Sequence, residues 1–145
     1  MRISLVKAEE VRPLRHLVLR PNLPVETTRY DLDNHKETIH LACIMNKKII
    51  SISTFYPENN SELKSKNGYR LRGMATHPKY RRMSAATKLI LEGLRLLKDQ
   101  KCDVLWCNAR LIAVDFYQSL GFKKIGPEFN IKNIGPHFKM FKTLN

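Results

Sequence analysis

Apolar and polar positions alternate along the chain in short segments that predict strands and helices in a mixed order. Apolar residues spaced three and four apart predict helices. These helices cover residues 8–19, 82–100 and 111–120. Two-residue alternation and short apolar runs predict strands. These strands cover residues 1–7, 39–45, 48–55, 69–76, 102–108, 122–131 and 138–144. Polar residues 25–37 predict a helix or a loop, and residues 57–68 predict a loop.

The order of these elements predicts the fold class. A strand, a helix and a strand follow one another in the middle of the chain, with hairpins on either side. This order is typical of an α+β fold, in which helices cover both faces of one central sheet. No repeat, low-complexity tract or linker divides the chain, so we expect one domain over residues 1–145.

The chain is strongly basic, with 26 Lys and Arg against 13 Asp and Glu, a formal net charge of +13. Residues 64–101 hold 11 of the basic residues and only 2 of the acidic ones. This concentration favours an anionic ligand, and the phosphates of a cofactor or of a nucleic acid both fit it. Charge alone does not choose between them, and a basic surface without a ligand is a third interpretation.

Composition also argues against several classes of protein. No segment approaches ~20 consecutive apolar residues, which disfavours a membrane span. Glu9 and Glu10 stand where a signal peptide would need an apolar run. The three cysteines lie in apolar segments without a metal-binding pattern, at positions Cys43, Cys102 and Cys107. We therefore expect core thiols in a reducing cytoplasm, no membrane association and no metal.

Residues 72–88 form the most informative segment, the end of a strand followed by a basic loop and the start of a helix. Arg81 and Arg82 precede three small residues, Ser84, Ala85 and Ala86. The first N–H groups of a helix lack internal partners and carry partial positive charge. Small residues let a ligand approach these groups closely. The segment therefore predicts a binding site for a pyrophosphate.

Two motifs resemble the GNAT N-acetyltransferase superfamily. Arg81-x-x-Ser84-x-Ala86 resembles the Arg/Gln-x-x-Gly-x-Gly/Ala loop with which that family holds the pyrophosphate of acetyl-CoA. Residues 113–122 resemble, more specifically, a helix of the family that carries Ala-x-x-Phe-Tyr and ends in Leu-Gly-Phe. Ser84 stands where the family usually has glycine, so we expect strain there if its φ is positive.

The resemblance implies a fold, a reaction and partners. The fold would be a GNAT-like mixed, mostly antiparallel central sheet flanked by helices on both faces. The reaction would be direct transfer of an acetyl group from acetyl-CoA to a primary amine of a small molecule or protein. A homodimer is compatible with it, because such proteins often dimerise. Three further segments resemble a bacterial subset with mostly unassigned acceptors: residues 14–21, 30–33 and 134–138.

The resemblance also implies roles for residues that match the family's motifs. Main-chain groups of Met74, Ala75 and Thr76 would align the pantetheine arm and polarise the thioester carbonyl. Asn108 would bond to the same arm, unless it only caps a strand end. Tyr117 would protonate the leaving thiolate, unless it is a core tyrosine. The pyrophosphate would be held by the Arg81 side chain and by main-chain N–H groups of Arg82, Met83, Ser84, Ala85, Ala86 and Thr87.

The general base and the acceptor pocket are less defined. Many relatives carry a glutamate on the strand before the phosphate loop, but residues 69–76 contain no carboxylate. A water chain, His40 or His137 could serve instead, although a histidine in a strand is more often structural. The resemblance places Tyr30, Asp31 and Asp33 where this fold usually builds its acceptor pocket, and they could bind a cationic amine, although a solvated polar loop is an equal alternative. Arg72 could orient an anionic group of the acceptor.

Two other functions compete with an N-acetyltransferase. A catalytically degenerate domain would bind an acyl-CoA as a sensor, and Ser84 together with the missing strand glutamate supports it. A nucleic-acid-binding module is less favoured, because only Tyr80 and Tyr69 could stack on bases among the arginines. Replacing Tyr117 would separate an enzyme from a sensor.

Overall fold

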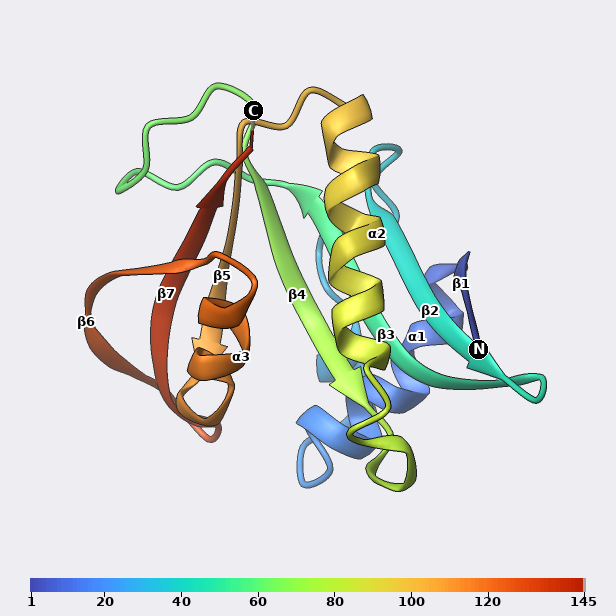
Figure 1. The fold of residues 1–145 in the computed structure, drawn as a ribbon. Coiled ribbons are helices and arrows are strands. Elements are labelled where there is room, and N and C mark those ends of the chain that lie inside the picture. Colours follow the sequence, from blue (N-terminus) through green and yellow to red (C-terminus); the bar gives the residue numbers. More distant parts are fainter. Residues whose placement is uncertain (145) are drawn as a thin grey trace.

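The computed structural model describes residues 1–144, which fold around one seven-stranded sheet (Figure 1). The strand order is β1-β2-β3-β4-β5-β7-β6, and only β4 and β5 run parallel. This confirms an α+β fold with a mixed, mostly antiparallel sheet. The strands are β1 (Arg2–Leu5), β2 (Ile39–Met45), β3 (Lys48–Pro57), β4 (Tyr69–Thr76), β5 (Val104–Arg110), β6 (Lys123–Ile131) and β7 (Gly135–Thr143).

Helices cover both faces of the sheet, as the sequence predicts. The α-helices are α1 (Ala8–Leu14), α2 (Ala85–Asp99) and α3 (Val114–Ser119). Short turns of other helices are η1 (Arg15–Leu19), η2 (Val25–Thr28), η3 (Pro78–Tyr80) and η4 (Leu111–Ala113). In Figure 1, α2 and α3 lie in front of the sheet and α1 lies behind it. No helix within residues 1–144 is long and apolar enough to cross a membrane.

Two apolar cores hold these layers together. The larger core joins α2 and α3 to the front of the sheet and includes the fully buried ring of Phe55 of β3. Gly93 of α2 packs directly on this ring: a Cβ there would lie 2.7 Å from two ring carbons of Phe55, Cε1 and Cε2. The smaller core joins Val11 and Leu14 of α1 to the back of the sheet. Because strand side chains alternate between faces, neighbouring residues of β2 feed different cores.

Two helix boundaries differ from the prediction, for local reasons. The helix predicted over residues 82–100 begins at Ala85, because Arg82 and Ser84 adopt positive φ. The helix predicted over residues 8–19 is α-helical only to Leu14 and then widens into the π-helical η1. Pro13 lies at this transition and lacks the N–H that an α-helix needs. Other boundaries differ by a few residues, as fraying ends do.

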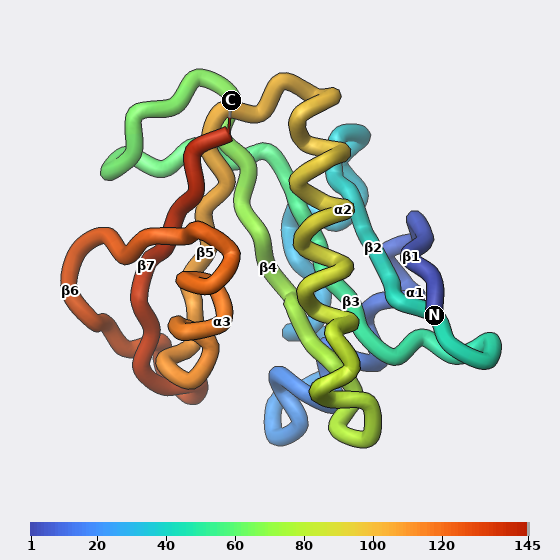
Figure 2. Tube along the Cα trace, viewed as in Figure 1, coloured from blue at the N-terminus to red at the C-terminus, as the bar shows by residue number. Residues whose placement is uncertain are grey.

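The parallel strands β4 and β5 separate soon after they meet. They pair only at Tyr69 with Leu105 and at Arg70 with Trp106. Figure 2 shows the two strands close together near the C-terminus and diverging below it, with α2 on one side of the opening and α3 on the other. The inner edges of both strands are therefore unpaired over most of their described length.

A β-bulge bends β4 beside this opening. Ser53 of β3 lies opposite two residues of β4, Gly73 and Met74, and Gly73 has a φ of 68°. A glycine in this left-handed region is the first residue of the G1 type of bulge. Its missing side chain also matters, because a Cβ there would lie 3.0 Å from Nε of Arg15 and 3.3 Å from the Tyr30 ring.

Candidate active site

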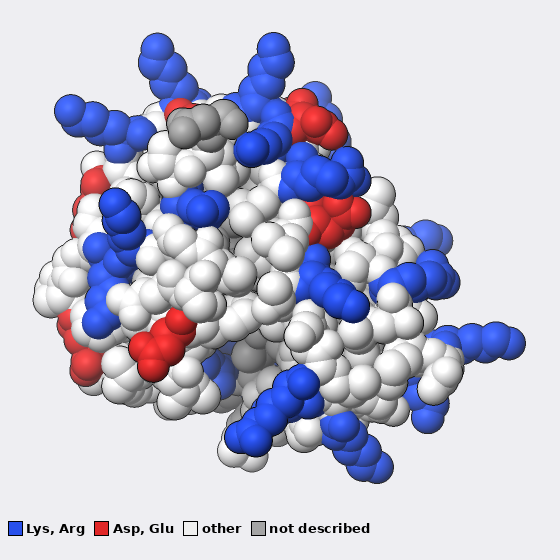
Figure 3. Space-filling view, in the orientation of Figure 1, with Lys and Arg blue, Asp and Glu red and all other residues white. Residues whose placement is uncertain are grey.

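A cavity of about 820 Å³ occupies the opening between β4 and β5. In Figure 3 the surface is hollowed between α3 and the loop that leads into α2, with basic side chains at the lower edge. The lining of the cavity contains no acidic residue, but it contains six arginines. They are Arg20, Arg70, Arg72, Arg81, Arg82 and Arg110. A wall with one sign of charge attracts an anionic ligand.

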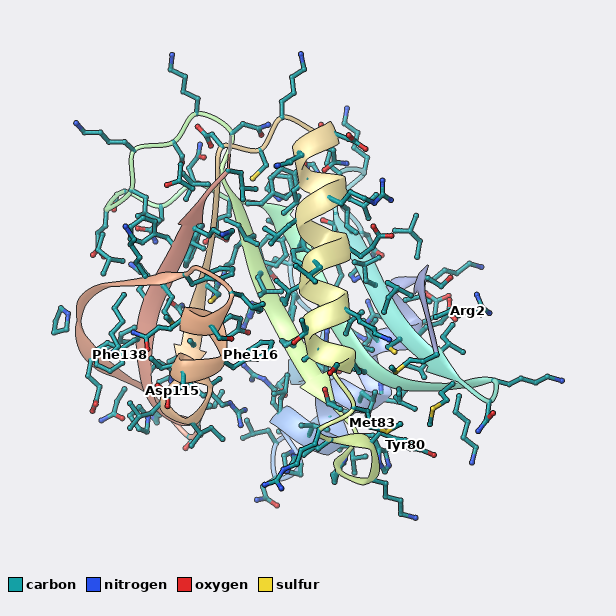
Figure 4. The ribbon with its side chains drawn as sticks, in the orientation of Figure 1. Arg2, Tyr80, Met83, Asp115, Phe116 and Phe138 are labelled. Atoms are coloured by element: carbon teal, nitrogen blue, oxygen red, sulfur yellow. The ribbon has the colours of Figure 1, made fainter. Side chains whose placement is uncertain are left out.

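The loop before α2 presents a row of backbone donors at one end of the cavity. Within residues 1–144, the N–H groups of residues 82–87 donate to no protein acceptor, and the first helical bond runs from Lys88 to the Ser84 carbonyl. Arg82 and Ser84 have φ values of 65° and 63°, on either side of Met83. Left-handed residues in a turn can direct successive N–H groups into one concavity that binds anions. Figure 4 shows Tyr80 and Met83 in this loop, below α2.

Asn108 and the unpaired strand edges line the middle of the cavity. The Oδ1 atom of Asn108 is buried and accepts no hydrogen bond in the part of the chain that the structure describes. An unmet buried acceptor is costly, so it fits a ligand that donates an N–H. Met74, Ala75 and Thr76 line the opposite wall along the open edge of β4. A slender ligand with amide groups matches these donors and acceptors.

Tyr117 of α3 lies in the wall of the cavity and is buried. The position of α3 is fixed by its C-terminal turn, where Gly121 donates to Gln118 and Phe122 donates to the Tyr117 carbonyl. The hydroxyl makes no hydrogen bond within residues 1–144, so it is available to a ligand. Burial, with a smaller contribution from Cys107, raises the pKa of Tyr117 well above its usual value. The phenol therefore keeps its proton at neutral pH. Figure 4 shows its neighbour Phe116 on the side of α3 that faces β4.

His137 of β7 also lines the cavity. Its Nδ1 lies 2.8 Å from the carbonyl oxygen of Gly135, and its ring stacks on Phe129 at 5.9 Å between centroids. A carbonyl oxygen only accepts hydrogen bonds, so Nδ1 carries a proton. In the neutral ring, Nε2 then holds a lone pair that can accept a proton.

His40 lies elsewhere, in a buried network between β2 and the segment before it. Its Nε2 donates to the Asp33 carbonyl at 2.9 Å, and its Nδ1 bonds to Thr54 Oγ1 at 2.9 Å. Burial lowers the pKa of His40, in spite of the nearby Asp33 carboxylate. Both ring nitrogens are used and the residue does not line the cavity, so the structure does not bring His40 to the site.

Tyr30 and Arg72 lie together at the other end of the cavity from the phosphate loop, with the Arg72 Cζ 3.9 Å from the centroid of the Tyr30 ring. Arg15 stacks on the same ring, also at 3.9 Å, and two guanidinium groups at this distance must occupy opposite faces. Asp31 lies beside them in the wall of a second cavity. Arg15 is not among the site residues predicted from the sequence. The one feature that could have indicated it is its position next to Leu14, on the apolar side of a predicted helix.

Arg20 and Arg110 are two further residues of the site that sequence reasoning missed. Arg110 at the end of β5 donates to the Leu19 carbonyl at 2.9 Å, which connects the β5 wall to η1. Burial, and then the nearby Arg20, lowers the pKa of Arg110. Nothing in the sequence pairs these two arginines, because 90 positions separate them. Within residues 1–144, no group of three His, Cys, Asp or Glu could hold a metal ion.

Comparison with known proteins defines the class. Residues 8–122 match the model of the acetyltransferase (GNAT) family. The chain is 35% identical over 144 residues to an uncharacterized N-acetyltransferase, YitI, of Bacillus subtilis (strain 168), which covers 99% of this chain and 97% of the relative. The chain therefore belongs to the GNAT acetyltransferase family and is an N-acetyltransferase.

Solved structures show the same fold at low sequence identity. An aminoglycoside 6'-N-acetyltransferase complexed with coenzyme A aligns with a TM-score of 0.77 and 15% identity, over 99% of this chain and 97% of that one. A putative N-acetyltransferase from Lactobacillus plantarum aligns with a TM-score of 0.79 and 14% identity, over the full length of both chains. These matches confirm the GNAT-like arrangement of sheet and helices.

Proposed function

We propose that this protein transfers an acetyl group from acetyl-CoA directly to a primary amine. The observation that carries the proposal is the row of unpartnered N–H groups over residues 82–87, set beside two arginines at one end of a cavity without acidic residues. A pyrophosphate needs such donors and charges. The coenzyme A in the similar aminoglycoside acetyltransferase structure supports the same ligand.

The remaining cavity residues suit the other parts of acetyl-CoA. Asn108 Oδ1 would accept an N–H of the pantetheine arm, which gives this buried oxygen its missing partner. Main-chain groups of residues 74–76, next to the β4 bulge, would align the arm, and one N–H would polarise the thioester carbonyl. Holding both substrates in line removes much of the entropic barrier to transfer.

Two side chains would handle the protons of the transfer. A bond forms between the amine nitrogen and the acetyl carbon, and the carbon–sulfur bond breaks. Tyr117, kept protonated by burial, would donate its proton to the departing thiolate. His137 would accept the proton that the amine loses, because its Nε2 holds a lone pair and its Nδ1–H is anchored on Gly135. His40 is not proposed for this role.

Calorimetry with the purified protein tests the cofactor. We expect saturable micromolar binding of acetyl-CoA and CoA, and weak, salt-sensitive binding of a short DNA duplex titrated at two salt concentrations. Arg81→Ala should weaken CoA binding, whereas Arg95→Ala, on an exposed part of α2 outside the cavity, should not. Tight DNA binding without CoA binding would instead support a nucleic-acid-binding module and overturn the proposal.

A further inference from the structure

A second cavity, of about 580 Å³, adjoins the first at the end away from the phosphate loop. Its wall includes residues of β3, β4 and the segment around Tyr30. The two cavities share four lining residues: Arg20, Tyr30, Arg70 and Arg72. A molecule in the second cavity would therefore contact the same arginines that close one end of the first.

Arginines outnumber carboxylates in the second cavity by four to two. Glu58 is already paired, with its Oε2 3.6 Å from Nη1 of Arg70. The other carboxylate, Asp31, is exposed to solvent. Within residues 1–144, no carboxylate forms an ion pair with the remaining three arginines: Arg20, Arg29 and Arg72. The cavity therefore has an excess of unpaired positive charge.

Arg72 is held in place without a negative partner. Its guanidinium lies on one face of the Tyr30 ring, and Arg15 supports the other face. Arg15 is itself buried and fixed by hydrogen bonds to the Asp33 carboxylate, the Thr28 carbonyl and Thr54 Oγ1 at 2.7–3.0 Å. A positioned guanidinium loses little freedom when it binds a carboxylate or phosphate, and its planar fork matches both.

This charge is not needed for the pyrophosphate. Arg72 precedes the end of β4 at Thr76 by four residues, which is roughly 13 Å along a strand. The phosphate loop lies beyond that end and supplies its own arginines, Arg81 and Arg82. A cationic acceptor such as a polyamine would need a free carboxylate. The buried carboxylate of Asp33 is not free, because it accepts hydrogen bonds from Arg15.

We propose that the acceptor is a small primary amine that also carries an anionic group, a carboxylate or a phosphate, and that Arg72 binds this group in the second cavity. The inference rests on the proposed acetyl transfer and specifies its acceptor. Arg20 and Arg29 add positive charge around the same group. A cationic acceptor, by contrast, would face the unpaired arginines and be repelled.

Matched pairs of amines test the inference on the wild-type protein. CoA thiol release is measured with β-alanine against β-alaninamide, with O-phosphoethanolamine against ethanolamine, and with spermidine as the cationic probe. We expect at least one amine with an anionic group to exceed its partner without that group about tenfold or more in kcat/KM. The first pair reports a carboxylate site and the second a phosphate site.

Variants connect this preference to Arg72. Arg72→Gln should reduce kcat/KM for the preferred anionic amine by about tenfold to hundredfold and leave the Kd of acetyl-CoA within about twofold. Arg72→Lys should recover only part of the loss, because an ammonium lacks the planar fork. Arg95→Gln, on the exposed side of α2, is the matched control and should match the wild type.

The two levels of the proposal fail differently. Preference for the amines without an anionic group or for spermidine, or no use of any amine with an anionic group, would overturn the inference. Acetyl-CoA binding would then leave the proposed function standing. An unchanged anionic preference in Arg72→Gln would also overturn the role of Arg72. Absence of acetyl-CoA binding would overturn the proposed function itself.

Discussion

Arg15 and Asp33 form a buried ion pair with two hydrogen bonds, from Nη1 to Oδ2 at 2.8 Å and from Nη2 to Oδ1 at 3.0 Å. Asp33 also accepts the backbone N–H of Tyr30 at 3.1 Å. The pair therefore fixes both the ring of Tyr30 and the guanidinium beneath it. The ion pair thus connects α1 and η1, on the back of the sheet, to Tyr30 in the wall of the candidate site.

Breaking this pair should destabilise the protein strongly. Asp33→Asn would leave the fully buried Arg15 charge uncompensated, which costs about 3–5 kcal/mol in similar cases. Urea denaturation at pH 7 measures the loss, and Asp31→Asn, two residues away and exposed, is the matched control. A loss below about 1 kcal/mol would contradict this prediction.

The same pair gives an acid dependence of stability. Burial acts to raise the pKa of Asp33, but the hydrogen bonds and charge of Arg15 outweigh it and leave the pKa lowered. A lowered carboxyl pKa stabilises the fold above the unfolded value of about 4, and this contribution is lost as pH falls through the folded value. The wild type should therefore lose stability below pH 4 more steeply than Asp33→Asn.

Replacing Tyr117 should separate catalysis from binding. Tyr117→Phe keeps the ring between Phe116 and Phe122 but removes the proposed proton donor. We expect kcat to fall by ~10²–10⁴-fold, with the Kd of acetyl-CoA within about twofold of the wild type. Tyr69→Phe, at the closed end of the strand opening, controls for loss of a hydroxyl. Unchanged turnover in Tyr117→Phe would remove Tyr117 from the mechanism.

Ser84 carries strain that glycine would relieve. Its φ is 63°, and its side chain is exposed and makes no capping hydrogen bond to the helix. Ser84→Gly should therefore stabilise the protein by up to ~1 kcal/mol, because glycine adopts positive φ without the Cβ penalty. Ser84→Ala is the matched control, since alanine keeps that penalty. Equal stability of the two variants, measured by thermal unfolding, would contradict this interpretation.

Alkaline pH should destabilise the fold through its buried thiols and phenols. Burial raises the pKa of Cys102 to about 11 and that of Cys107 to about 12, and burial with nearby Glu37 raises that of Tyr69 to about 12. At a pH between the unfolded and folded pKa values of these groups, the folded chain holds more protons than the unfolded chain. Stability should therefore fall as pH rises from about 9, by about 1.4 kcal/mol per pH unit for each retained proton.

Urea denaturation under reducing conditions measures this alkaline slope. Cys102→Ser removes one titrating group, and its hydroxyl can still donate to the Val104 carbonyl as the thiol does at 3.3 Å. Between pH 9 and 11, the stability of Cys102→Ser should fall less steeply with pH than that of the wild type, by the contribution of one retained proton. A stability that is constant or rises over this range would contradict the prediction.

The sequence predicts the fold well where local patterns decide it. Residues 85–99, which have helical apolar spacing, form α2, and the alternating residues 69–76 form β4, as predicted. Helices also cover both faces of the sheet. The loop before α2 and the segment around Tyr117 are also local, and residues of both lie in the cavity wall.

The rest of the site depends on contacts between distant segments. Arg72 and Arg15 meet across the Tyr30 ring although they belong to a strand and a helix far apart in the chain. His40 and His137 are both strand histidines in the sequence, and only tertiary packing puts one in a buried network and the other at the cavity. Likewise, no local pattern shows that β4 and β5 separate after two residue pairs.

The separation of β4 and β5 has a consequence for the solubility of the chain. An unpaired strand edge on a protein surface attracts strands of other molecules and promotes aggregation. Here the open edges face each other across the first cavity, and α2 and α3 lie beside them (Figure 1). A flat strand from a neighbouring molecule has no straight approach to them, whereas a thin, flexible chain can enter. The same geometry that exposes backbone groups to a ligand thus shields them from self-association.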